Sequence, residues 1–138
     1  MNENIQDAVA KRLLGALAEI DRLLRNHAME LRGSPAVRNA QASLGMALYE
    51  NGPVLEGYVE AGLANGDSVC WCLDVRWNQD SWTIEATLDR KSGDRQQTVK
   101  ELPVENLDDL DGFLRALKRI VHELLSLRIS EVEIARPQ

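Results

Sequence analysis

The chain has 138 residues, of which 44% are hydrophobic and 28% are charged, and its formal net charge is −6 at pH 7. A chain of this length is expected to form one domain that buries roughly 70% of its unfolded surface, so it can fold without disulfides or a metal. The negative charge argues against nucleic-acid binding, because phosphate contacts rely on clustered Lys and Arg.

Residues 1–20 contain acidic side chains and no unbroken apolar run, so we expect neither a signal peptide nor a membrane span there. The chain has two cysteines and no sign of secretion, which favours reduced thiols. The expected location is therefore the cytoplasm.

The N-terminal part is predicted to be helical. Residues 4–32 repeat apolar side chains at helical spacing, which indicates one long amphipathic helix, or two helical halves hinged near Gly15. Gly33-Ser34-Pro35 then supplies a C-terminal glycine, an N-cap serine and a first-turn proline. The following residues, up to Glu50, predict a second helix with Val37, Leu44 and Leu48 as its apolar residues and many small side chains that would let it pack closely. Residues 4–50 are thus expected to form an antiparallel helical hairpin.

The pattern then changes to a period of two. Apolar and polar residues alternate in 54–63, 67–77 and 81–89, as is typical of half-buried antiparallel strands. A fourth strand is expected over 95–102, at the edge of the sheet, where its charges remain solvated. The sequence therefore predicts a four-stranded β-meander over 54–103.

Loop lengths predict how these strands pair, because directly opposed residues share a face. Leu63 must pair with Asp67, which leaves a three-residue loop whose last residue, Gly66, takes the left-handed conformation.

The next loop has two solutions that preserve the faces. A two-residue loop at Asn78-Gln79 pairs Val75 with Trp82. A four-residue loop instead sets Asp74 opposite Glu85, which brings like charges together, so we expect the shorter loop.

A second helical pattern follows the strands. Asn106 is the expected N-cap of a helix over 106–127, which has acids early and bases later, as the helix dipole prefers. Residues 128–138 could add a short strand. The predicted fold class is α+β, a single domain over 1–138 in which the helical hairpin, the β-meander and the C-terminal helix follow in order, with all helices on one face of the sheet.

The stretch Cys70-Trp71-Cys72 raises the question of a metal or redox site. Residues two apart on a strand share a face, so both thiols should lie on the polar side while Trp71 and Trp77 bury against the helices. The spacing differs from the Cys-x-x-Cys redox motif. Zinc would need two further ligands, and His27 and His122 lie on distant helices. We therefore expect free thiols and no metal or cofactor.

Catalytic motifs are not found. The sequence contains no nucleophile elbow, P-loop, dinucleotide fingerprint or zinc-protease motif. Four acids, Glu56, Glu60, Asp74 and Glu85, could meet on one sheet face, but exposed acids are common on an acidic protein. No catalytic residue is assigned, and an enzyme is the less favoured interpretation.

The sheet face away from the helices is the better functional candidate. It combines those acids with a tyrosine and an arginine, two residue types that are favoured at protein interfaces. The predicted protein-binding residues are Tyr58, Glu56, Glu60, Asp74, Arg76 and Glu85. A plain solvated face and a homodimer interface are the competing interpretations. The partner would be another protein, possibly basic, with no nucleic acid and no membrane involved.

In its general build the chain is similar to bacterial immunity proteins and small secretion chaperones, a similarity of architecture and charge without a shared motif. The leading hypothesis is therefore a non-enzymatic acidic protein-binding module, either an adaptor or an immunity-like or chaperone-like protein. The alternative is a small-molecule-binding or hydrolytic domain with its site between the sheet and the helical hairpin, near His27.

Overall fold

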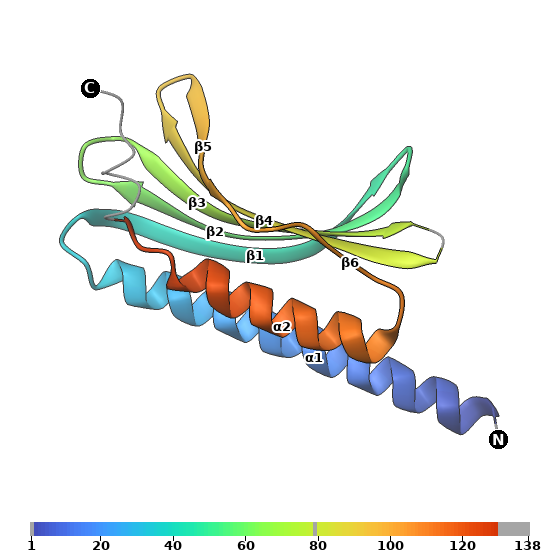
Figure 1. Cartoon of the computed structure of the whole chain (residues 1–138). Helices are drawn as coiled ribbons and strands as arrows, with labels where there is room; N and C mark the ends of the chain where they lie inside the picture. Colours follow the sequence, from blue (N-terminus) through green and yellow to red (C-terminus); the bar gives the residue numbers. More distant parts are fainter. Residues whose placement is uncertain (1, 79, 130–138) are drawn as a thin grey trace.

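The computed structural model describes residues 2–78 and 80–129, which fold into one antiparallel sheet with two helices on one of its faces (Figure 1). The α+β class and the placement of the helices on one face agree with the sequence prediction. In chain order, the elements are α1 (Asn2–Arg32), β1 (Val37–Tyr49), β2 (Gly52–Leu63), β3 (Ser68–Asn78), β4 (Ser81–Ser92), β5 (Arg95–Glu101), β6 (Glu105–Leu107) and α2 (Leu110–Ser126).

The helical hairpin predicted over 4–50 is wrong in its second half. Residues 37–49 form strand β1, which pairs with β2 along its whole length. Its even positions from Ala40 to Leu48 are all apolar, and the first of them, Ala40, is buried. Alanine and leucine favour helices, but pairing with β2 overrides that weak local preference.

The sheet is a meander in the order β1-β2-β3-β4-β5, and the short β6 also pairs with β4. Strands β2, β3 and β4 confirm the three alternating segments, and β5 lies at the edge of the order, as predicted. The meander nevertheless has more strands than the four expected, because β1 and β6 were not recognised as strands.

The loop between β2 and β3 has the predicted form. The Leu63 amide donates to the Asp67 carbonyl at 2.7 Å, and Gly66 has a φ of 93°. That left-handed conformation is easy for glycine, which lacks a Cβ.

The predicted register between β3 and β4 is wrong. Val75 lies opposite Ile84, not Trp82, and Asp74 lies directly opposite Glu85. This is the register of the four-residue alternative, although Asn78 also pairs with Ser81, which shortens the loop; it places Trp77 opposite Trp82, and their ring centroids are 4.7 Å apart. Packing of the two indoles favours this register over the one that separates the acids.

The C-terminal helix begins later than predicted. Its N-cap is Asp109, whose carboxylate accepts a hydrogen bond from the Gly112 amide, and the helix runs from Leu110 to Ser126. Asn106, the predicted cap, lies in β6, where its Oδ1 accepts a hydrogen bond from Thr83 at 2.6 Å. Residues 130–138, including most of the segment that could add a strand, lie outside the described residues.

The core lies between the sheet and the helices. Trp71 at its centre is fully buried, as predicted, and its indole N–H donates to the Leu127 carbonyl at 3.0 Å. Trp77 also faces the helical side but is 43% exposed at the end of β3, so its predicted burial is only partial. At Gly57 a Cβ would lie 3.2 Å from the Leu24 side chain, so the absence of a side chain lets α1 approach β2 closely.

Neither helix in the described ranges has the combination of length and apolarity that a bilayer crossing requires.

Candidate functional site

The side of the sheet opposite α1 and α2, which we call the outer face, carries polar side chains along its central strands. Its residues alternate with the buried ones on β2, β3 and β4. All six residues predicted to bind a protein lie on it: Tyr58, Glu56, Glu60, Asp74, Arg76 and Glu85. No helix covers them in the part of the chain that the structure describes (Figure 1).

The register brings three of these acids into one line. Glu56 on β2 lies opposite Asp74 on β3, which lies opposite Glu85 on β4. We call these three residues the acidic row. Directly opposed side chains have Cβ atoms about 5 Å apart, so the three carboxylates are close neighbours.

The other predicted residues flank the acidic row. On one side, Tyr58 lies opposite Cys72, and Glu60 lies opposite Cys70 one step further along. On the other side, Arg76 lies opposite Thr83. The predicted set therefore forms one continuous patch, with Tyr58 half-buried in its middle and Arg76 exposed near its end.

Asp74 occupies the centre of the acidic row, and its side chain is half-buried. Burial raises the pKa of its carboxyl above the ordinary value, and the negative charges of Glu56 and Glu85 raise it further. The Arg76 guanidinium opposes this shift without cancelling it. A half-buried carboxylate between two others is thus held where its negative charge is poorly compensated.

Tyr49 belongs to the same site, although the sequence interpretation missed it. It ends β1 on the outer face, and its hydroxyl donates a hydrogen bond to Glu56 Oε1. That bond, followed by the charge of Glu56, raises the pKa of the Tyr49 phenol. The alternation of residues 37–49 was the signal for a strand that brings this ring to the sheet.

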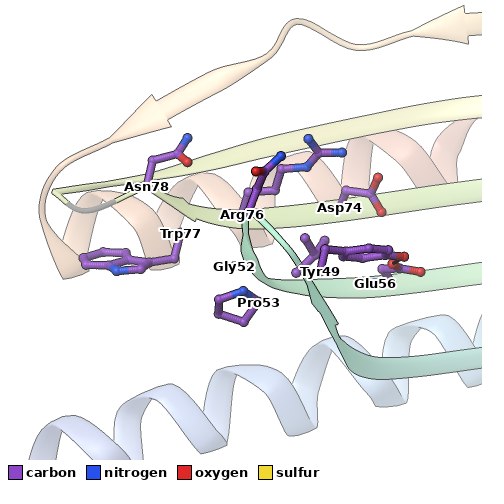
Figure 2. A pocket seen from close by; sticks show the side chains of 10 residues that line it. Tyr49, Gly52, Pro53, Glu56, Asp74, Arg76, Trp77 and Asn78 are labelled. Carbon is purple, nitrogen blue, oxygen red and sulfur yellow. Dashed lines mark hydrogen bonds between the residues drawn. The ribbon is translucent and has the colours of Figure 1, made fainter.

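A pocket opens where the β1–β2 hairpin meets the end of β3. Its volume is about 640 Å³, and we call it the acidic pocket. Figure 2 shows Asp74 and Arg76 on β3 beside Tyr49 and Glu56, with Trp77 and Pro53 nearer the end of the strand. The pocket thus combines two carboxylates and a phenol with one guanidinium, that of Arg76, and Trp77 borders it at the end of β3. Such a lining suits a positively charged group with an apolar stem.

His27, the residue behind the alternative hypothesis, lies elsewhere. It lines a second pocket of about 420 Å³ between the C-terminal ends of α1 and α2, together with Glu30 and Trp71. Its ring stands edge-on to the Trp71 indole, with centroids 4.9 Å apart, and its Nε2 is buried without a hydrogen-bond partner among the residues that the structure describes. Burial lowers the pKa of His27, more than the Glu30 charge raises it, which favours the neutral imidazole.

Within residues 2–78 and 80–129, no group of three or more His, Cys, Asp and Glu side chains is arranged to hold a metal ion. Cys70 and Cys72 are free thiols on the outer face. Comparison of the chain with protein families, with curated proteins and with solved structures finds no match to any of them.

Proposed function

We propose that this protein is a non-enzymatic binding module that recognises a basic segment of another protein with its outer face. It would act as an adaptor, or in the manner of an immunity protein or a small chaperone. The observation that supports this most is the acidic row, in which Glu56, Asp74 and Glu85 stand directly opposite one another on three adjacent strands.

The acidic row is unfavourable for the isolated protein. Like charges directly opposite one another destabilise a sheet, by up to about 1 kcal/mol per pair. A cationic side chain over the row would relieve this repulsion, which, after burial, contributes to the raised pKa of Asp74. Binding of a cationic segment would therefore be favoured by the loss of electrostatic repulsion within the acidic row.

The acidic pocket suggests how one basic side chain would be held. A Lys or Arg head group would lie between Glu56 and Asp74, while its methylene stem packs on Tyr49. Tyr58, half-buried in the adjacent patch, would supply an aromatic anchor for the neighbouring residues of the same segment.

A charge-matched comparison tests the proposal. One variant neutralises the acidic row with Glu56→Gln, Asp74→Asn and Glu85→Gln. Its control removes the same number of charges from the helical side with Asp7→Asn, Asp108→Asn and Glu123→Gln, all at exposed positions. Titration calorimetry with an arginine- and lysine-rich peptide should show roughly ten-fold weaker binding for the row variant, since exposed ion pairs contribute about 0.2–1 kcal/mol each.

Equal loss of affinity in both variants would mean that net charge alone drives binding, and the proposal of a docking face would then be wrong. Kinetics give a second readout. Reversing Glu56 and Glu85 to Lys should slow association, whereas Tyr58→Ala should speed dissociation.

The pocket at His27 supports a second candidate, a small-molecule site. Its specific support is that His27 and Glu30, a neutral imidazole and a carboxylate, line one cavity of about 420 Å³. Thermal-shift screening with small apolar compounds that carry one polar group tests this candidate. Compounds that stabilise the wild type should not stabilise the His27→Leu variant. Hits that stabilise both proteins equally would contradict this candidate.

A further inference from the structure

Cys70 and Cys72 are close enough to react with each other. Their sulfur atoms are 3.0 Å apart on the outer face of β3, and the Cys72 thiol is placed to donate a hydrogen bond to Cys70 Sγ. Both side chains are half-buried and both are free thiols. Strand geometry alone brings side chains two residues apart to one face, but the close sulfur contact is particular to this pair.

The two thiols differ in their surroundings. Cys70 opens into a cavity of about 170 Å³, which it lines together with Glu60, Asp89 and Lys91. Cys72 does not line that cavity, and its Sγ lies 3.6 Å from Asp89 Oδ2. The hydrogen bond with Cys70, followed by burial and the Asp89 charge, raises the pKa of the Cys72 thiol. Cys70 is therefore the sulfur that a small reagent reaches, whereas the raised pKa of Cys72 keeps that thiol protonated.

We propose that Cys70 and Cys72 form a redox-active dithiol that exchanges with small disulfides. The Cys70 thiolate attacks one sulfur of the reagent, whose S–S bond breaks, and the first reagent thiolate leaves. Cys72 then loses its proton to that thiolate and attacks the Cys70 sulfur, expelling the second reagent thiolate. The two protein thiols are oxidised to an internal disulfide and the reagent is reduced to two thiols, which take up the two protons.

The strand makes this disulfide reversible. Residues two apart on an extended strand have Cα atoms about 6.6 Å apart, close to the upper limit for a disulfide. Closing the bond requires β3 to shorten locally between its partners β2 and β4. Such strained disulfides are readily reduced, so the pair should cycle between its two states.

The surrounding charge predicts which reagents react fastest. Glu60 lies opposite Cys70 on β2 and Asp89 lies opposite it on β4. Two cations also line the cavity, Lys91 one step further along β4 and Arg90, but the Arg90 guanidinium is neutralised by its ion pair with Asp67. The acidic row adds further negative charge along the same strands. A cationic disulfide should therefore react faster than a neutral one, and an anionic one slowest.

The experiment follows intact mass during reaction with cystamine (cationic), bis(2-hydroxyethyl) disulfide (neutral) and glutathione disulfide (anionic). The wild type should lose two hydrogens and retain no reagent, and dithiothreitol should restore the original mass. Cys72→Ser should stop at a mixed disulfide on Cys70, whereas Cys70→Ser should react about ten-fold more slowly, because the remaining Cys72 thiol is half-buried beside Asp89 and does not line the cavity. Rates should fall in the order cystamine, hydroxyethyl disulfide, glutathione disulfide, with smaller differences at high salt.

A wild-type protein that retains one or two reagent molecules would overturn the internal disulfide. Cys70→Ser reacting as fast as Cys72→Ser would overturn the assignment of the attacking sulfur. These measurements need no binding partner, so their outcome neither depends on the proposed docking function nor tests it.

Discussion

The two faces of strand β3 are built on opposite principles. On the helical side, Trp71 and Leu73 are fully buried and packed into the core. On the outer face of the same strand, Cys72 and Asp74 are half-exposed, and Asp74 has acids opposite it on both neighbouring strands. One face gains stability from apolar burial, whereas the other carries a charge arrangement that folding alone does not favour.

This contrast separates residues that hold the fold from residues available for binding. A side chain on the helical face cannot change without disturbing the core, because close-packed interiors tolerate little loss of volume. A side chain on the outer face can change charge while the core stays intact. Mutations on the two faces of β3 should therefore affect different properties.

The largest expected effect is on the helical face. Trp71→Ala removes a fully buried indole and its hydrogen bond to Leu127, and should cost about 3–5 kcal/mol of unfolding free energy. Urea denaturation measures it, with Trp77→Ala, at the exposed end of the strand, as the milder control. If Trp71→Ala were as stable as the wild type, the assignment of the two faces would be wrong.

A smaller effect of opposite sign is expected on the outer face. Asp74→Asn removes a charge that opposes both Glu56 and Glu85, and should stabilise the protein by about 0.2–1 kcal/mol near neutral pH. The same change should weaken binding to a basic peptide. A loss of stability in this variant would mean that the acidic row is not under repulsion.

The pH dependence sharpens that prediction. Because the pKa of Asp74 is raised in the folded protein, the folded chain binds more protons than the unfolded chain between the two pKa values. The contribution of Asp74 to the unfolding free energy therefore falls as pH rises through that window. The stability gain of Asp74→Asn should be smallest in acid and grow towards neutral pH. A gain that is independent of pH would contradict this origin.

The smallest effect is expected at the thiols. Replacing Cys70 and Cys72 together by Ser should change the unfolding free energy by no more than about 0.5 kcal/mol under reducing conditions, since both lie on the half-exposed face. Thermal unfolding with and without a chelator checks this. Chelator-induced unfolding of the wild type would instead reveal a structural metal.

The sequence predicted the central strands well because their alternation is strong. In 67–77, every odd residue from Val69 to Trp77 is apolar, and such a period can be buried on only one face. The same alternation placed all six predicted binding residues on the outer face. It could not reveal the acidic pocket, because Tyr49 lies on a strand that was interpreted as a helix.

Residues 37–49 misled the prediction for a physical reason. Alanine, leucine and methionine at alternating positions have good helix propensity, so local preference and strand period conflict there. Only pairing with β2, a long-range interaction, decides in favour of the strand. The β3–β4 register shows the same limit, since the contact between Trp77 and Trp82 outweighs the repulsion between Asp74 and Glu85.

The most direct test of the docking face is to map where a basic peptide binds. Amide correlation spectra of isotope-labelled protein, recorded during addition of an arginine- and lysine-rich peptide, should show saturable shifts on β2, β3 and β4 around Glu56, Asp74 and Glu85. These shifts should disappear when the three acids are neutralised together. Shifts centred on the helical side, or scattered over all exposed acids, would contradict a docking function for the outer face.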